Sequence, residues 1–273
     1  MKKTLLKNAA VAALVMAAAG AAFAEDGRSI IQKVLDVKKP DFNHSMVKMD
    51  LIEKTGTVEE SRIIEEFGRH NQNTDTSDLV IIFKNSTNKS NINIRFLQME
   101  NKGKDDDKWI YMPALRTTRR VNSSEGDKSF TGTDASYDDM ATRELDDDVH
   151  ELLGEETKNG FDCWKIKSTP TDKMMQKAQY KYRIQWIDKK TYIPVYAEMY
   201  DKKSGELEKV LTVEKLENIN GYNIPTSNLL KNVQTGHATR IAALQNKDGK
   251  YAIILDKPIP DSVFTQNFLN TGK

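Results

Sequence analysis

Metal-binding and redox motifs are almost absent from this sequence of 273 residues. The single cysteine, Cys163, excludes an intramolecular disulfide, and the four histidines lie too far apart in the sequence to pair at a metal-ligand spacing. No Cys-x-x-Cys, His-Glu-x-x-His or Gly-x-Ser-x-Gly motif occurs. The acidic runs 105–107 and 146–148 lack the spaced ligands and the turn glycine of a calcium loop. We therefore expect no metal, no cofactor and no catalytic centre.

Long apolar runs are also lacking, except at the N-terminus. Residues 9–22 are rich in Ala, Val, Leu and Met, follow three lysines, and lead into Ala-Phe-Ala at 22–24. A basic start, a short apolar core and a small-x-small ending are typical of a secretory signal peptide. The run is shorter than the roughly 20 residues that a membrane-spanning helix needs. We predict a cleaved signal peptide over residues 1–24 and a single domain over residues 25–273, which resides in the periplasm.

The mature chain shows no excess of one charge. Without the three N-terminal lysines it carries 38 basic and 40 acidic residues, a net charge of −2. A near-neutral balance gives no electrostatic basis for binding nucleic acid. Glu25 stands where a bacterial lipoprotein would carry its acylated cysteine, so we do not expect the protein to be a lipoprotein itself.

What the sequence does contain is alternation of apolar and polar residues with a period of two, as in 46–52, 61–67 and 92–97. This pattern predicts half-buried β-strands, whereas residues 29–39 have the spacing of one short helix. Two-residue turn signals recur between the strands, at 159–160, 204–205, 220–221 and 248–249. Such turns join antiparallel neighbours and give about ten or eleven strands. We expect a mainly β protein, in which a strongly curved antiparallel sheet has a few helices over its concave side.

One stretch, residues 122–143, breaks this pattern. It combines Gly-rich turns with a short helical signal after Ser136 and carries Phe130, Tyr137 and Met140. Irregular segments of this length inside a β protein are commonly functional. We expect these three apolar residues to belong to a flap over the mouth of a cavity.

Several short motifs together resemble one family. Their ranges are 109–116, 119–121, 129–134, 136–139, 221–225, 235–239 and 259–265. In this order they resemble the outer membrane lipoprotein-sorting proteins, relatives of the periplasmic carrier LolA, over most of the mature chain. The resemblance implies an unclosed β-barrel with an apolar cavity that binds acyl chains of a lipoprotein or a lipid. The partners it implies are an inner-membrane exporter and an outer-membrane acceptor.

The candidates for lining such a cavity are bulky apolar residues in the middle strands. They are Trp109, Tyr111, Leu115, Trp164, Tyr182, Ile184 and Trp186. A second hypothesis stays open, in which the same fold is a non-enzymatic adaptor or sensor that binds a partner protein rather than a lipid. A lipid that co-purifies with the protein would favour the carrier.

The first prediction concerns the N-terminus. Because Ala-Phe-Ala precedes Glu25, we expect protein from the native host to begin at Glu25. N-terminal sequencing checks this, and a mature product that retains Met1 would contradict it.

Overall fold

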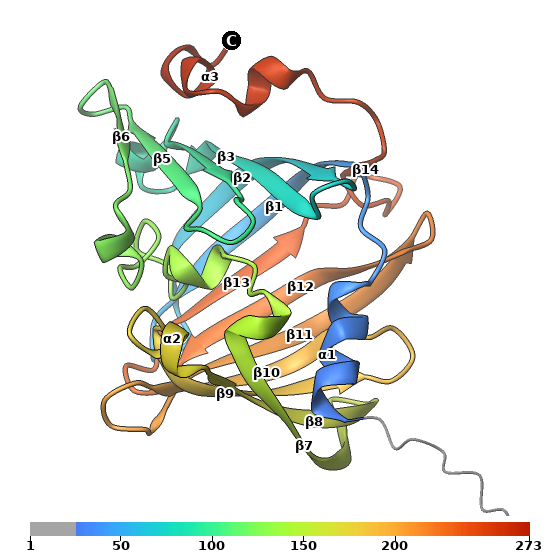
Figure 1. Cartoon of the computed structure of the whole chain (residues 1–273). Helices are drawn as coiled ribbons and strands as arrows, with labels where there is room; N and C mark the ends of the chain where they lie inside the picture. The colour runs from blue at the N-terminus through green and yellow to red at the C-terminus, as the bar shows by residue number, and fades with distance from the viewer. Residues whose placement is uncertain (1–25) are drawn as a thin grey trace, which may run out of the picture.

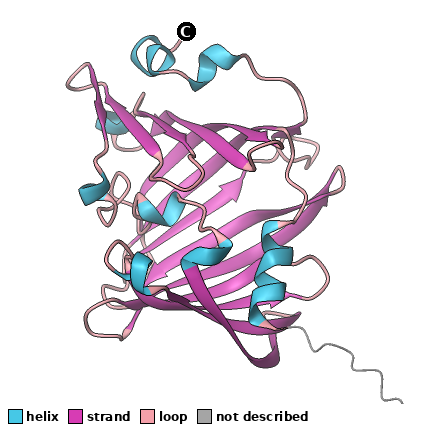
Figure 2. Ribbon diagram, in the orientation of Figure 1, coloured by secondary structure: helices cyan, strands magenta, loops and turns pink. Residues whose placement is uncertain are grey.

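The computed structural model describes residues 26–273, so the predicted signal peptide and its cleavage site lie outside the described residues. Fourteen strands form one antiparallel sheet, in the order β6-β5-β4-β3-β2-β1-β13-β12-β11-β10-β9-β8-β7, with β14 paired to β1 beside β13. The sheet curls around a concave side without closing, and β6 and β7 remain as its two edges (Figures 1 and 2). The expected fold class is confirmed.

The elements have the following bounds. The helices are α1 (Gly27–Leu35), α2 (Asp172–Met175) and α3 (Gln266–Thr271), and the short 3-10 turns are η1 (Lys89–Asn91), η2 (Ser123–Glu125), η3 (Asp138–Met140), η4 (Leu145–Asp147) and η5 (Asp261–Phe264). The first strands are β1 (Phe42–Ile52), β2 (Val58–Asn71), β3 (Thr76–Ser86), β4 (Arg95–Met99), β5 (Asp107–Met112), β6 (Thr117–Arg120) and β7 (Asp148–Lys158). The others are β8 (Phe161–Pro170), β9 (Tyr180–Asp188), β10 (Pro194–Asp201), β11 (Leu207–Ile219), β12 (Tyr222–Asn232), β13 (Ala238–Ala243) and β14 (Ile253–Leu255).

The tight hairpins follow from local turn chemistry. Asn159 and Gly160, between β7 and β8, have φ values of 51° and 85°, and Asn220 and Gly221, between β11 and β12, have 52° and 86°. Two successive residues with positive φ match the right-handed twist of the flanking strands, and Asn-Gly adopts them at little cost. These four residues therefore fix the register of two of the longest strand pairs.

The strand count is higher than the ten or eleven predicted. Short strands such as β6 and β14, of four and three residues, carry too little alternation to be recognised in the sequence. The predicted helix at 29–39 is present but ends at Leu35, because the chain turns at Asp36 before reaching Pro40.

The concave face is covered by α1 on one half of the sheet and by residues 122–143 on the other (Figure 1). We call residues 122–143 the covering segment. Ile30 and Ile31 of α1 pack on Ile166 of β8 and Ile187 of β9. Asp26 caps α1 by accepting a hydrogen bond of 2.7 Å from the backbone N–H of Ser29.

The convex face of β2 to β5 is covered by the C-terminal segment, residues 259–271 (Figure 1). Phe264, Phe268 and Leu269 bury themselves against Val80 and Leu97, which point away from the concave side. Arg95 of β4 donates a hydrogen bond of 2.5 Å to the carbonyl oxygen of Leu269 and so satisfies one of the last carbonyls of α3. One of the described helices thus lies on the side opposite to the expected one.

Among residues 26–273, no helix has the length and hydropathy needed to cross a bilayer.

We predict that the C-terminal segment contributes strongly to stability. Leu269 is fully buried, so Leu269→Ala should lower the free energy of unfolding by about 2–5 kcal/mol. The midpoint temperature of thermal unfolding would fall by roughly 2–4 °C for each kcal/mol lost in a protein of this size. Ile254→Ala is the control, because 47% of Ile254 is exposed and its loss should cost little. Equal, small effects of both changes would contradict the packing described here.

Candidate functional site

The concave wall of β1 to β5 is apolar and ends in an aromatic cluster. Phe83 of β3 and Phe96 of β4 meet Phe130 and Tyr137 of the covering segment. The ring centroids of Phe96 and Phe130 lie 5.1 Å apart, and those of Phe130 and Tyr137 lie 5.7 Å apart, both near the edge-to-face geometry that aromatic pairs prefer. Phe130 is 2% exposed and Tyr137 is 5% exposed. The covering segment therefore fills this half of the concavity with its own side chains.

Polar contacts, rather than a continuous backbone ladder, attach the covering segment to the sheet. Lys108 of β5 donates a hydrogen bond of 2.9 Å to the carbonyl oxygen of Tyr137. Lys209 of β11 lies 3.0 Å from Asp139 Oδ2, and the Tyr180 hydroxyl donates to Asp139 Oδ1 at 2.7 Å. These bonds link the covering segment to strands on both halves of the sheet.

Arg62 of β2 lies beneath the covering segment and is 2% exposed. Its guanidinium binds both carboxylate oxygens of Glu60, at 2.8 and 3.0 Å, and donates to Thr131 Oγ1 at 3.2 Å. Burial alone would raise the pKa of Glu60, but hydrogen bonds from Arg62, Ser86 and Asn91 outweigh it and lower the pKa to about 2. The ion pair is therefore present at any physiological pH, and it offers Thr131 a fixed donor.

A third attachment joins Asp134 of the covering segment to His237 and Thr239. His237 Nδ1 lies 2.8 Å from Asp134 Oδ2, and His237 Nε2 lies 3.1 Å from Glu59 Oε1. Burial alone would lower the pKa of His237, but the hydrogen bonds with the two carboxylates outweigh it and raise the pKa. When the imidazole is protonated it donates to both acids at once, and it then holds the covering segment beside the start of β13.

A cavity of about 670 Å³ opens between α1, α2 and the covering segment. Its walls are mainly polar and carry both charges, with Lys108, Arg143 and Arg183 among the bases and Asp106 and Asp138 among the acids. Tyr137 and Val121 belong both to this wall and to the apolar cluster on the concave face. The polar cavity is thus continuous with the apolar wall at these two residues.

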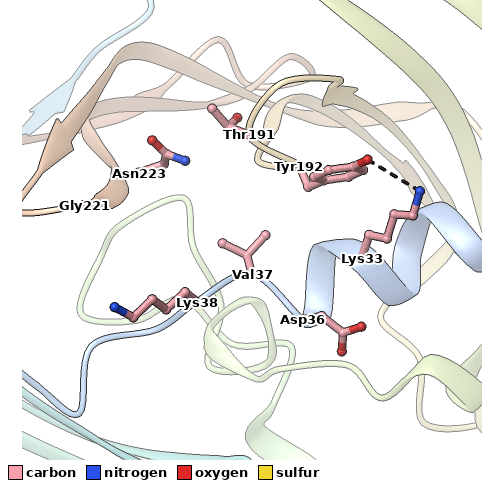
Figure 3. A pocket seen from close by; sticks show the side chains of 8 residues that line it. All are labelled: Lys33, Asp36, Val37, Lys38, Thr191, Tyr192, Gly221 and Asn223. Carbon is pink, nitrogen blue, oxygen red and sulfur yellow. Dashed lines mark hydrogen bonds between the residues drawn. The ribbon is translucent and has the colours of Figure 1, made fainter.

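A smaller pocket of about 330 Å³ lies between the end of α1 and two turns, those joining β9 to β10 and β11 to β12 (Figure 3). Lys33 Nζ lies 3.5 Å from the Tyr192 hydroxyl at one side, and Val37 supplies an apolar side chain. Most of its other lining residues are polar, so it offers little surface to an acyl chain.

The structure separates the seven residues that the sequence groups as cavity lining. Trp109 and Tyr111 belong to the convex cluster under the C-terminal segment. Leu115 lies in the turn after β5 and is 66% exposed. Trp164 packs with α1 on the concave face.

The other three lie on the opposite face of β9 from Ile187, which packs on α1. Strand register places Tyr182, Ile184 and Trp186 on the convex side, where no described helix covers them. Trp186 is nonetheless 2% exposed, because it packs with Cys163 in a buried apolar cluster and Lys165 Nζ lies 4.7 Å from its ring centroid. Of the seven candidates, Trp164 therefore lies on the concave side.

The three residues expected on a flap all lie on the covering segment and over the concave face. Phe130 and Tyr137 are buried in the aromatic cluster, and Met140 packs beside it. Sequence reasoning missed their sheet partners Phe83 and Phe96, as well as Arg62. The signal for Arg62 was its period-two relation to Ile64, which places both on one face.

Comparison with known proteins gives the family. The sequence matches a family described as “-like: Uncharacterized protein” over residues 75–271. Similar folds include a DUF1329 family protein from Desulfovibrio piger, with a TM-score of 0.79 and 24% identity over 89% of this chain and 97% of that one. The model covers more than half of the chain, so the chain belongs to this family.

Two further structures support the LolA-like fold. A domain from Vibrio parahaemolyticus, described as an outer membrane lipoprotein-sorting protein, has a TM-score of 0.78 and 23% identity over 89% of this chain and 98% of that one. A LolA superfamily protein from Nitrosomonas europaea has a TM-score of 0.62 and 19% identity over 90% of this chain and all of that one, 100%. No curated protein matches the sequence.

We predict that attachment of the covering segment depends on pH through His237. Since folding raises the pKa of this histidine, its contribution is complete below the ordinary value of 6.5 and is lost as the pH rises through the folded-state pKa. Urea unfolding at pH 5.5 and pH 8.5 measures this contribution. The free energy of unfolding should be lower by about 1 kcal/mol or less at the higher pH, since His237 is partly exposed to solvent.

The matched variant is His237→Gln, which cannot take up the proton. It should remove this part of the pH dependence and be less stable than the unmodified protein only at the lower pH. An unchanged difference between the two pH values in His237→Gln would contradict the assignment.

Proposed function

We propose that this protein is a non-enzymatic periplasmic carrier that shelters an acyl chain of a lipoprotein or lipid against the concave wall of β1 to β5. One observation carries the proposal: this apolar wall is covered by an irregular segment rather than by a helix or another sheet. The wall consists of Val47, Met49, Leu51, Ile64, Ile81, Phe83, Phe96 and Ile110. If the covering segment moves aside, this wall becomes the surface on which the acyl chain lies.

The energetics of acyl chains demand such a wall. Each methylene gains about 0.8 kcal/mol on leaving water, so a chain of roughly sixteen carbons gains about 12 kcal/mol. A flat surface patch cannot shelter a chain of that length, whereas the concave side of a curled sheet can enclose it. The carrier must also release the chain again, which requires a closed state that competes with the cargo.

The covering segment is suited to that competition. Its apolar contribution consists of Phe130, Tyr137 and Met140, while its other attachments are hydrogen bonds and ion pairs. Once the segment moves aside, water can replace these polar contacts at a net cost of about 1 kcal/mol each. When the segment opens, the apolar wall loses its contacts with Phe130, Tyr137 and Met140, and the acyl chain would take their place. The free energy gained on loading would therefore offset the free energy lost on opening.

In this proposal the cargo comes from the inner membrane, by way of an exporter, and passes to an acceptor at the outer membrane. The lipoprotein-sorting description of the Vibrio parahaemolyticus domain, which shares the fold, supports this direction. The second candidate is an adaptor that binds a partner protein, and the tight aromatic packing of the covering segment favours it. A protein that never opens would bind no acyl chain.

A reversible lock distinguishes the two candidates. The backbone N–H of Asp134 donates to Thr239 Oγ1 at 2.9 Å, and the Thr239 hydroxyl donates to Asp134 Oδ2 at 2.7 Å, so the side chains are adjacent. The double variant Asp134→Cys with Thr239→Cys should form a disulfide between the covering segment and β13. We expect the oxidised form to lose binding of a fluorescent fatty acid and the reduced form to regain it.

The single variant Thr239→Cys, treated with the same oxidant, is the control for the chemistry. Cys163 is fully buried and burial raises the pKa of its thiol to about 11, so it should not interfere. If the oxidised and reduced forms of the double variant bind the fatty acid equally, the acyl chain does not lie beneath the covering segment. No binding by any form would favour the adaptor.

A further inference from the structure

Arg183 occupies an unusual place on the concave side. Register pairs it with Ser168 of β8 and Met199 of β10, and it shares a face with Ile187, which packs on α1. It lines the cavity of about 670 Å³ that opens between α1, α2 and the covering segment. A cationic side chain therefore lines this cavity.

The guanidinium of Arg183 has no hydrogen-bond or ion-pair partner among residues 26–273. Its contact is with an aromatic ring, since its central carbon lies 5.6 Å from the ring centroid of Tyr180. Arg116 is the one other arginine in the described chain without such a partner, and it is exposed, in the turn after β5. Water can solvate the guanidinium of Arg116, whereas Arg183 is half-buried.

The acidic residues around Arg183 are already engaged by other cations. Asp148 accepts two hydrogen bonds from Arg143, of 2.7 and 2.8 Å. Asp139 is bound by Lys209 and by the Tyr180 hydroxyl. The two acids nearest to Arg183 are therefore engaged elsewhere, and the charge of Arg143 also acts on it, although the wider cavity wall carries acids as well as bases.

Proton loss cannot remove this charge. Burial, together with the charge of Arg143, lowers the pKa of Arg183, but a guanidinium stays protonated in proteins. A charge that is withdrawn from water and left unpaired is costly. A partner that enters the cavity and carries negative charge would remove that cost.

We propose that Arg183 binds the anionic headgroup, a phosphate or a carboxylate, of the acylated cargo. The planar fork of arginine fits either group with two parallel hydrogen bonds. The position is consistent with an amphipathic ligand, because Tyr137 and Val121 join this cavity to the apolar wall. The headgroup would lie in the polar cavity while the chain lies under the covering segment. This inference rests on the proposed carrier function.

The test compares ligands that share one chain and differ in the headgroup. Calorimetric titration of dodecyl phosphate, laurate and dodecanol, each below its micelle concentration, gives their affinities for the unmodified protein and for Arg183→Gln. We expect Arg183→Gln to lower the affinity for dodecyl phosphate and for laurate by about tenfold or more, as for a lost charge-assisted hydrogen bond. The affinity for dodecanol should stay unchanged. The affinity of Arg183→Lys for the two anionic ligands should lie between those of the unmodified protein and of Arg183→Gln.

Arg116→Gln is the matched control, because it removes the same charge from the exposed arginine and should change no affinity. Thermal unfolding without ligand gives a second readout. Removal of an unpaired, partly buried charge should leave the stability of Arg183→Gln unchanged or higher. A marked loss of stability would instead assign Arg183 a structural role and overturn the proposal.

The remaining outcomes separate this inference from the carrier function. If all three ligands bind and Arg183→Gln weakens them equally, the headgroup assignment is wrong and the carrier function stands. If inorganic phosphate binds through Arg183 as tightly as dodecyl phosphate, and dodecanol does not bind, the site takes a free anion and both proposals fail. If neither phosphate nor any dodecyl ligand binds, both proposals also fail.

Discussion

Phe130 and Tyr137 meet the main physical requirement of this fold, which is to keep water from the concave wall of an unclosed sheet. A closed barrel protects its interior by its own strands, but here β6 and β7 remain as edges and the concavity stays open. Aromatic side chains bury about 150–250 Å² each, worth about 4–6 kcal/mol per ring at about 25 cal/mol per Å². The rest of the covering segment can be polar and irregular because these two rings supply its apolar contact.

The two faces of the sheet are protected in different ways. The concave face receives α1 and the covering segment, and the convex face of β2 to β5 receives the C-terminal segment. On the convex face of β8 to β10, lysine side chains lie over the aromatic rings of Trp186 and Tyr182. Lysine stems can shield rings while their ammonium groups stay in water. Trp186 is also 2% exposed and packs in a buried cluster with Cys163, so this face is shielded by side chains of the sheet itself rather than by a helix.

This arrangement explains what the sequence could and could not predict. Asn-Gly pairs at 159–160 and 220–221 specify hairpins through backbone conformation, which is a local property, so the antiparallel order could be derived. Alternation in β9 likewise separates Tyr182, Ile184 and Trp186 from Arg183 and Ile187. It does not say which set faces inward, because both faces of a sheet have the same period. The inward direction depends on α1, which packs on Ile187 from more than 150 residues away.

Two buried ionisable groups on the concave side show why the cavity favours an anion. Glu66 of β2 shares a face with Ile64, and it accepts a hydrogen bond of 3.1 Å from the Ser45 hydroxyl. Burial raises the pKa of Glu66, so this carboxyl can become neutral and remain in apolar surroundings. A guanidinium has no such option, because its neutral form is out of reach at physiological pH. Glu66 can thus adapt to an empty interior by binding a proton, whereas Arg183 requires water or a negatively charged group from outside the chain.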